Sequence, residues 1–205
     1  MDEFGEFPRH VLESLRQPLE DGVITVTRAR QTTTYPARFM LVAAMNPCPC
    51  GLEGTEQRCA CTPHAMEVYR RRVSGPLLDR IDMHVQVGRV ETTQLLSDRE
   101  ALASAVVRAR VEAARAFAKD RHEAYGVNSN AEIASGRLIR ACALGEGVDG
   151  VLARAADKHR MSARAVHRVL RVARTIADLA GRDHLGRDDV FEALTYRFAH
   201  KEISE

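Results

Sequence analysis

Apolar and polar residues divide the chain into two parts of different character. Up to about residue 90, continuous apolar runs alternate with short helical patterns and cysteine-rich loops. From about residue 97 onward, apolar residues recur at intervals of three and four, the spacing of amphipathic helices. This pattern predicts helices over residues 98–120, 130–143, 148–158, 163–179 and 187–199. We therefore expect an α/β domain over residues 1–90, followed by an all-helical domain over residues 91–205.

The α/β assignment of the first part depends mainly on one apolar run. Residues 39–45 read Phe-Met-Leu-Val-Ala-Ala-Met, with no charged or amide side chain among them. Unbroken apolarity over the length of a strand is typical of a central strand that is covered on both faces, as in a parallel sheet. A further short strand is predicted over residues 83–87.

A short helix and a hairpin are predicted ahead of that run. Pro8 suits the first turn of a helix, where its missing N–H costs nothing, and we expect Pro18 and Gly22 to close the helical pattern. Residues 23–28 alternate β-branched side chains, and residues 31–35 are again rich in threonine. The two stretches predict a β-hairpin with arginines near its turn.

Composition places the chain among globular proteins and excludes two other classes. Hydrophobic residues make up 45% and charged residues 28%, so a core can form beneath a charged surface. No apolar run approaches the roughly 18 residues that a membrane span requires. The first residues are acidic, unlike a secretory signal, so a cytoplasmic protein is the default expectation.

Net charge alone says little about nucleic acid, because it is only +2. The arginines are clustered, however, and arginine prefers planar, bidentate partners such as phosphate. For most of these arginines, solvated helix faces with interspersed acids are the favoured interpretation. The clusters comprise Arg28, Arg30, Arg70, Arg71, Arg72, Arg164, Arg168, Arg171 and Arg174.

Four cysteines form the pattern C-x-C-x8-C-x-C in the first part, at Cys48, Cys50, Cys59 and Cys61. Four thiols in a polar loop are a ligand set for one tetrahedral zinc ion, and in an intracellular protein this is the better interpretation than two disulfides. His64 is an alternate ligand if one thiol does not take part. Cys142 lies on an apolar helix face and is predicted to be a core residue.

Two polar features could serve nucleotide chemistry. The acidic pair Asp2-Glu3 is of the kind that holds Mg²⁺ and polarises water in nucleotide hydrolases, although terminal acids are usually just solvated. Asn46 directly follows the predicted central strand, where α/β sheets bind ligands, but it could equally be a turn residue before Pro47.

Two arginines are candidates for contacts with a γ-phosphate. Arg80 lies in the turn Gly-Pro-Leu-Leu-Asp-Arg-Ile-Asp, from which an arginine finger could reach a neighbouring subunit; a local ion-pair cluster with Asp79 and Asp82 is the alternative. Arg164 falls in the first turn of a predicted helix after Ser162, where the helix dipole mildly disfavours a cation. An anionic partner would explain Arg164, and a plain surface position is the alternative.

The order of these features resembles one family, the magnesium-chelatase-like AAA+ ATPases, and within it the ComM/YifB subfamily. An acidic pair, a hairpin with arginines, a strand that ends in Asn-Pro, the Gly-Pro-Leu-Leu-Asp-Arg-Ile-Asp turn and a helical region with Ser-x-Arg occur in that order. The resemblance covers nearly the whole chain. The segments that carry it most closely are residues 7–13, 16–22, 44–51 and 172–179.

The resemblance implies a partial P-loop AAA+ core, with an incomplete parallel sheet, followed by an all-helical lid. In this family's scheme Asp2 helps to hold Mg²⁺ and Glu3 orients the attacking water. Asn46 corresponds to sensor 1, Arg80 to a finger that acts on the next subunit, and Arg164 to sensor 2.

The resemblance also implies partners and cofactors, namely ATP, Mg²⁺, DNA and a hexameric ring of identical subunits. The hairpin over residues 22–38 would face the pore of that ring, which suggests Arg28 and Arg30 as DNA contacts.

One motif of the family is missing from the printed sequence. No G-x-x-x-x-G-K-[ST] phosphate-binding loop occurs in it, so we expect the chain to be the second half of such an ATPase, starting at the Walker B acidic pair. The main hypothesis is a fragment of a ComM-type DNA motor. The alternatives are an ATPase subunit of a magnesium chelatase and a non-catalytic interaction module stabilised by zinc.

Overall fold

The computed structural model describes residues 1–29, 31–53, 58–88, 90 and 102–198, and they form two compact units, Met1–Ile81 and Asp82–Glu205. Each unit is described by itself below. The expected domain boundary at residues 90 and 91 stays a prediction. No helix among the described residues is long and apolar enough to cross a membrane.

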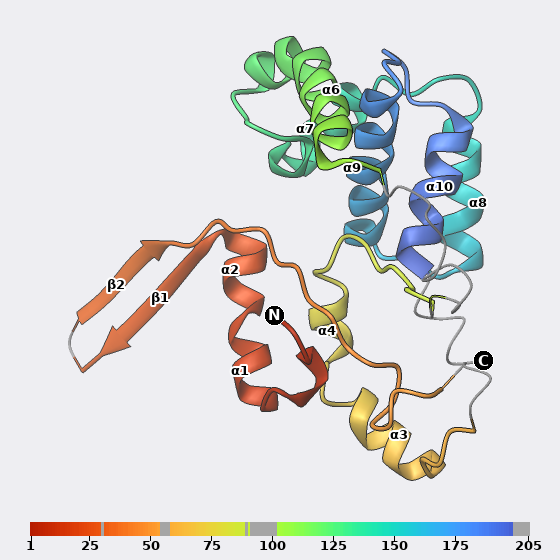
Figure 1. Ribbon diagram of the computed structural model, residues 1–205. Helices are drawn as coiled ribbons and strands as arrows, with labels where there is room; N and C mark the ends of the chain where they lie inside the picture. The colour runs from red at the N-terminus through yellow and green to blue at the C-terminus, as the bar shows by residue number, and fades with distance from the viewer. Residues whose placement is uncertain (30, 54–57, 89, 91–101, 199–205) are drawn as a thin grey trace. The chain divides into compact units, whose positions relative to one another are not determined.

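The first unit consists of short helices and one hairpin (Figure 1). Its elements in chain order are η1 (Phe4–Glu6), α1 (Arg9–Ser14), α2 (Arg16–Asp21), β1 (Val23–Arg28), β2 (Gln31–Pro36), α3 (Pro63–Arg70) and α4 (Gly75–Leu78). A small core holds them together. It consists of Phe4, Leu12, Val73 and Leu77, with Phe7, Leu15, Leu19, Leu41, Leu78 and Ile81 packed around them.

The helical pattern predicted after Pro8 forms two short helices, α1 and α2, which meet at Leu15. Pro18 lies in the first turn of α2, where no N–H is needed, so it does not end the helix as predicted. Gly22 does end it, with a φ of 66°, the left-handed conformation that glycine adopts without penalty.

The hairpin is confirmed. Strands β1 and β2 pair antiparallel from Val23 opposite Pro36 to Arg28 opposite Gln31. The threonines face one another across the ladder, with hydroxyl oxygens 3.3 Å apart for Thr27 and Thr32. Among the described residues, these two strands form the only sheet. No further strand lies beside them, and most of their side chains are exposed.

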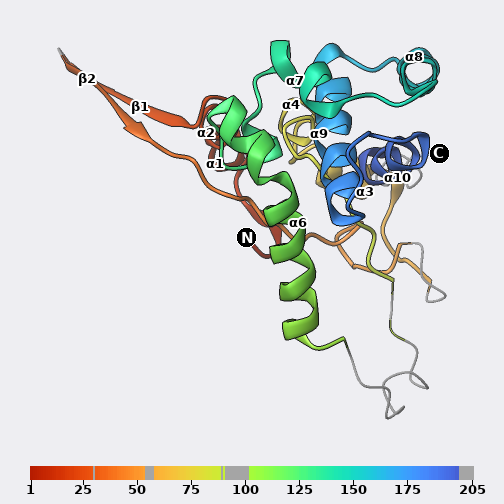
Figure 2. The same cartoon turned by 90° about the horizontal axis from the view of Figure 1, so that it is seen from above.

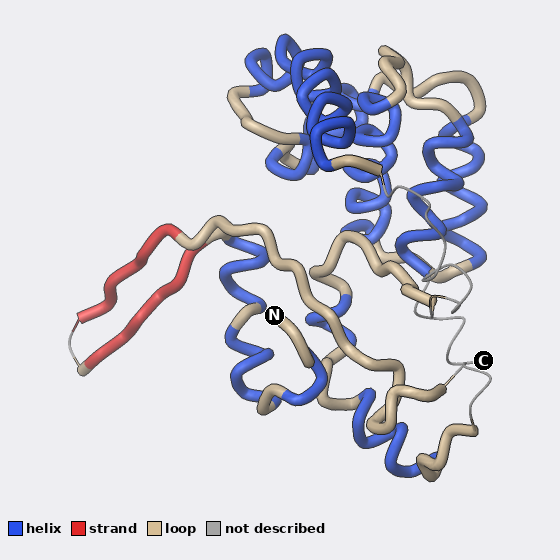
Figure 3. Tube along the Cα trace, viewed as in Figure 1, coloured by secondary structure: helices blue, strands red, loops and turns tan. Residues whose placement is uncertain are grey.

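The prediction of a buried strand at residues 39–45 is wrong. Figure 3 shows this run as extended chain without strand structure, and the exposed fractions of Met40 and Val42 are 87% and 68%. Its backbone hydrogen bonds join it on one side to Met1 and Phe4. Unbroken apolarity indicates a segment suited to a sheet, but strands beside it and helices over it must also be present to bury it. The described residues supply neither, so the predicted parallel sheet is not found among them.

The run at residues 83–87 is likewise not a strand in the structure. One backbone bond, from the N–H of His84 to the carbonyl of Tyr196 at 2.7 Å, joins it to the helical unit.

The second unit is helical, as predicted. Its elements are α6 (Ser104–Tyr125), η2 (Asn130–Glu132), α7 (Ser135–Cys142), α8 (Val148–Lys158), α9 (Ala163–Leu179) and α10 (Arg187–Phe198). The bounds of α8 and α9 agree with the predicted ranges, and residues 98–101 of the first predicted helix lie outside the described residues. Helix α9 is central, since α6, α7 and α10 all pack against it.

The core of the second unit surrounds α9 and includes Val169, Leu170 and Ala173 from that helix, together with Cys142, which confirms its predicted core position. Ser162 caps α9 as expected, because its hydroxyl accepts a hydrogen bond from the N–H of Ala165 at 3.2 Å. Figure 2 shows that the first half of α6 extends beyond the other helices of this unit.

Candidate functional site

The acidic pair and Asn46 lie on neighbouring stretches of backbone. The N–H of Ala44 donates to the carbonyl of Met1 at 2.9 Å, and the N–H of Phe4 donates to the carbonyl of Ala44 at 2.8 Å. These bonds enclose Asp2 and Glu3 opposite the residues that lead into Asn46. All three side chains are exposed, so carboxylate and amide oxygens are available to a ligand at this edge.

Glu3 has an unusual backbone conformation. Its φ of 48° and ψ of 44° are left-handed, a region that side chains other than those of glycine and asparagine rarely occupy. The N–H of Glu3 donates to the Asp2 carboxylate at 2.9 Å, which holds the two acids in a fixed local arrangement. Conformations of this kind occur preferentially at functional sites.

Helix α3 connects this edge to the rest of the first unit. Tyr69 is buried, and burial is the main cause that raises the pKa of its hydroxyl. A side-chain carbon on Gly5 would lie only 2.7 Å from that hydroxyl, so any larger residue at this position would have to displace the Tyr69 ring. Arg72, just beyond α3, donates to the Gly5 carbonyl at 3.1 Å and pairs with Glu6.

The four cysteines of the C-x-C pairs converge, as predicted. Their sulfur atoms all lie within 4.8 Å of one another, and the Cys48, Cys50 and Cys59 sulfurs are 3.4, 3.5 and 3.7 Å apart. Disulfide sulfurs would be about 2.05 Å apart, so these are free thiols. Cys48 is buried and Cys50 is exposed, with the other two between.

Hydrogen bonds polarise this set of thiols. A bond from the backbone of Leu52 is the main cause that lowers the pKa of Cys50 to about 6. The hydrogen bond with Cys50 is the main cause that raises the pKa of Cys61 to about 12. Four thiols this close cannot all ionise without a cation among them, because like charges disfavour one another.

Arg80 is held within the first unit. Its side chain is only 14% exposed; its Nε lies 3.0 Å from a carboxylate oxygen of Glu20, and one terminal nitrogen donates to the Pro76 carbonyl at 2.7 Å. Asp82, the other predicted partner, pairs with Arg168 in the second unit. The proposed role of Arg80 as a finger is not tested by these contacts.

Arg164 lies in the first turn of α9 and is exposed, one helical turn before Arg168. Because it belongs to the second unit, its position relative to Asp2, Glu3 and Asn46 is not described. Arg28 ends strand β1 and is exposed, whereas Arg30 lies outside the described residues.

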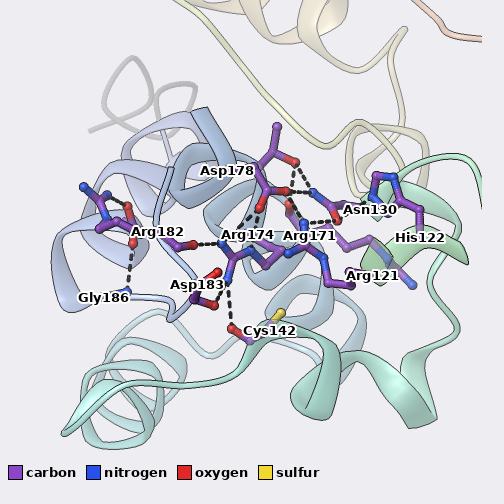
Figure 4. A network of polar contacts seen from close by, with 12 residues as sticks. Arg121, His122, Asn130, Cys142, Arg171, Arg174, Asp178, Arg182, Asp183 and Gly186 are labelled. Atoms are coloured by element: carbon purple, nitrogen blue, oxygen red, sulfur yellow. Dashed lines mark hydrogen bonds and ion pairs between the residues drawn. The ribbon is translucent and has the colours of Figure 1, made fainter. Parts of the chain in front are cut away.

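A buried polar network lies inside the second unit, between α6, α7 and α9 (Figure 4). Arg174 is fully buried and donates to the Asp178 carboxylate at 3.1 Å and to the backbone carbonyls of Cys142 and Asp183 at 3.2 and 2.8 Å. Asp178 also accepts from Arg121 and, at 2.8 Å, from the side-chain amide of Asn130. This network ties the connecting segments of the unit to its central helix.

The residues that support these sites were not assigned that role from the sequence, and Arg72 and Arg174 were named there only as members of arginine clusters. They are Tyr69, Arg72, Glu20 and the Arg174–Asp178 pair. For the pair a signal was present. Arg174 lies four residues after Leu170 and three before Ala177, on the apolar stripe of α9, and Asp178 follows one turn later. A charged residue on such a stripe needs a buried partner.

Comparisons with known proteins place both units in one family. The family model described as magnesium chelatase, subunit ChlI matches residues 1–95, and the model of the ChlI C-terminal region matches residues 101–197. An uncharacterized protein of Mycobacterium tuberculosis is 41% identical over 197 residues, which are 96% of this chain and 39% of that protein.

Two further relatives carry names. The competence protein ComM of Haemophilus influenzae is 41% identical over 200 residues, and the uncharacterized protein YifB of Escherichia coli is 39% identical over 204 residues. Each match covers 96% of this chain and 38% of the relative. The chain thus spans about two fifths of the length of the curated relatives it matches.

Proposed function

The chain belongs to the magnesium-chelatase-like AAA+ family, and on that premise we propose that it supplies the magnesium-binding, sensor and lid residues of an ATP-driven motor that acts on DNA. The proposed cofactors are ATP, Mg²⁺ and, at the four-cysteine cluster, Zn²⁺. The proposed working form of the complete protein is a hexameric ring of identical subunits.

Each site residue has a role in this proposal. Asp2 helps to hold Mg²⁺, and Glu3 orients the water that attacks the γ-phosphate. Asn46, on the neighbouring segment of backbone, hydrogen-bonds that water and the γ-phosphate and so positions them. Arg80 and Arg164 supply positive charge, the first to the nucleotide of the neighbouring subunit and the second from the helical unit.

One observation carries the proposal. The backbone hydrogen bonds between Met1–Phe4 and Ala44 place the acidic pair and Asn46 on adjacent segments, as a magnesium ligand and a phosphate sensor require. The left-handed backbone of Glu3 supports it further, since it aims that side chain differently from a continuing strand.

The catalytic part of the proposal predicts a loss of turnover on Glu3→Gln. In a protein that joins this chain to the phosphate-binding region of a relative, magnesium-dependent ATP hydrolysis should fall by at least ~10²-fold, because glutamine cannot take a proton from water. Nucleotide binding, measured with a fluorescent ATP analogue, should remain. A variant that turns over ATP normally would contradict the role of Glu3.

The DNA part of the proposal predicts a change in salt dependence on Arg28→Ala. Arg28 is exposed at the end of β1, and each lost phosphate contact should reduce the slope of log affinity against log salt by about 0.7 for single strands. Fluorescence anisotropy with a labelled oligonucleotide measures this slope. Arg154→Ala, an exposed arginine of α8, is the control and should leave it unchanged. Equal slopes for both variants would show that Arg28 of the hairpin does not contact DNA.

The two alternatives make different demands on the molecule. The family descriptions name a magnesium chelatase subunit, but the named relatives with 96% coverage of this chain are ComM and YifB, which favours the ComM-type motor. The four-cysteine cluster favours a zinc-stabilised interaction module. That module would keep its fold and its metal in the Glu3→Gln protein, and the joined protein would show no nucleotide turnover even with Glu3 present.

A further inference from the structure

The four cysteines join two segments that meet at Asn46. Cys48 and Cys50 lie in the turn that directly follows Asn46, and Cys59 and Cys61 come just before α3, whose N-cap is Thr62. An ion bound by all four sulfurs would therefore tie the turn after Asn46 to the beginning of α3.

The other end of α3 returns to the same place. Arg72, just beyond α3, donates to the carbonyl of Gly5 beside the acidic pair, and the hydroxyl of Tyr69, in the last turn of α3, lies against Gly5. Arg70 pairs with Glu53 in the loop between the cysteine pairs. The cysteine cluster and α3 thus connect the turn after Asn46 to the backbone beside the acidic pair.

We propose that the Zn²⁺ bound by Cys48, Cys50, Cys59 and Cys61, through α3 and Arg72, holds Asn46 beside Asp2 and Glu3. This inference deepens the proposed function at the cysteine cluster; its consequence for catalysis rests on the proposed ATPase role, whereas the fixing of Asn46 by the ion does not.

The geometry fits a single ion. A tetrahedral zinc with Zn–S bonds of about 2.3 Å has sulfur–sulfur edges of about 3.8 Å, close to the separations of 3.4 to 3.7 Å found here. Four protein ligands leave no open coordination position, so the ion is structural. Binding converts four thiols to thiolates and releases their protons to solvent.

The first test measures metal in the chain purified without chelator. Wild-type protein and Cys142→Ser should carry close to one zinc per chain, while Cys59→Ser should retain little after dialysis. Cys142 is the matched control, because it is a buried thiol in the other unit. Cobalt substitution should give the visible absorption of a tetrahedral thiolate site. Zinc-free wild-type protein, disulfides between the pairs, or equal zinc in Cys59→Ser would overturn the proposal.

The second test separates the positioning of Asn46 from simple folding. Hydrogen exchange of the peptide that contains Asn46 should speed up when zinc is removed from wild-type protein by a chelator. Arg72→Ala should speed up exchange there by about fivefold, the effect of one lost hydrogen bond to the Gly5 carbonyl, while zinc content stays unchanged. Unchanged exchange after both treatments would overturn the link between the ion and Asn46.

The third measurement concerns catalysis in the joined, phosphate-binding protein. Arg72→Ala should lower kcat and leave the KM for ATP nearly unchanged, because in this proposal Arg72 acts through the backbone beside the acidic pair. If that protein proves inactive, the proposed function is refuted, while the metal and exchange measurements still decide the present inference.

Discussion

The 205-residue chain by itself is expected to hydrolyse ATP no faster than the uncatalysed reaction. Phosphoryl transfer is catalysed mainly by positioning and by charge stabilisation, and the backbone cradle and lysine of a phosphate-binding loop are the main positioning device. The printed sequence contains no such loop. A coupled assay of phosphate release with and without Mg²⁺ measures the rate.

In the joined protein that carries a phosphate-binding loop, Arg80→Ala should lower kcat by ~10³-fold or more, the usual contribution of an arginine finger. Arg71→Ala is the control, since Arg71 is an exposed arginine of the same unit that pairs with Glu67. Mixing Arg80→Ala subunits with Glu3→Gln subunits should restore part of the activity, because some interfaces then combine an intact finger with an intact acidic pair. Robust turnover by the short chain, or an equal loss in both arginine variants, would contradict this assignment.

Asp178→Ala should destabilise the helical unit by about 3–5 kcal/mol, because it leaves charged groups buried without their carboxylate. Arg174 is fully buried and makes its ion pair with Asp178, to which Arg121 and Asn130 also donate. Alkylation of Cys142 reports the loss. That thiol is buried, and burial is the main cause that raises its pKa to about 11, so it reacts only when the unit opens.

Site-resolved mass spectrometry should show Cys142 alkylated at least ~10²-fold faster in Asp178→Ala, in keeping with that free energy. Glu123→Ala is the control. It removes the Lys119–Glu123 pair, whose side chains are 70% and 67% exposed, and such pairs contribute about 0.3–0.5 kcal/mol. Similar Cys142 reactivity in the two variants would show that the buried network does not hold the unit together.

The helical unit could be predicted closely because its signals are local. The apolar stripe of α9 and the cap at Ser162 are both encoded within a few residues of the helix, and the structure begins and ends that helix where the pattern does. The hairpin was predictable for the same reason, since alternation and a two-residue turn set its register.

The run at residues 39–45 shows where local signals stop. Its composition matches a central strand, but its burial depends on adjacent strands and covering helices, which are formed by residues distant in the sequence. The convergence of the cysteines was predictable from their spacing, because four thiols in two close pairs form a ligand set for one tetrahedral ion. The roles of Arg72 and Glu20 were not, because a hydrogen bond to the Gly5 carbonyl and an ion pair with Arg80 depend on how the helices of the first unit pack.

Within the part of the chain that the structure describes, hydrogen bonds join the hairpin to the rest of the first unit near its base. Gln17 of α2 bonds Thr25 at 3.3 Å, and the N–H of Ala37 closes the base on the carbonyl of Gly22 at 2.8 Å. Two-stranded ribbons are marginally stable in water, so order should decline from this base toward Arg28. A single hairpin would therefore grip a polyanion weakly, because contact must first order the tip. Several hairpins around one strand would combine by avidity, and a strand held by many weak contacts can advance by exchanging them one at a time.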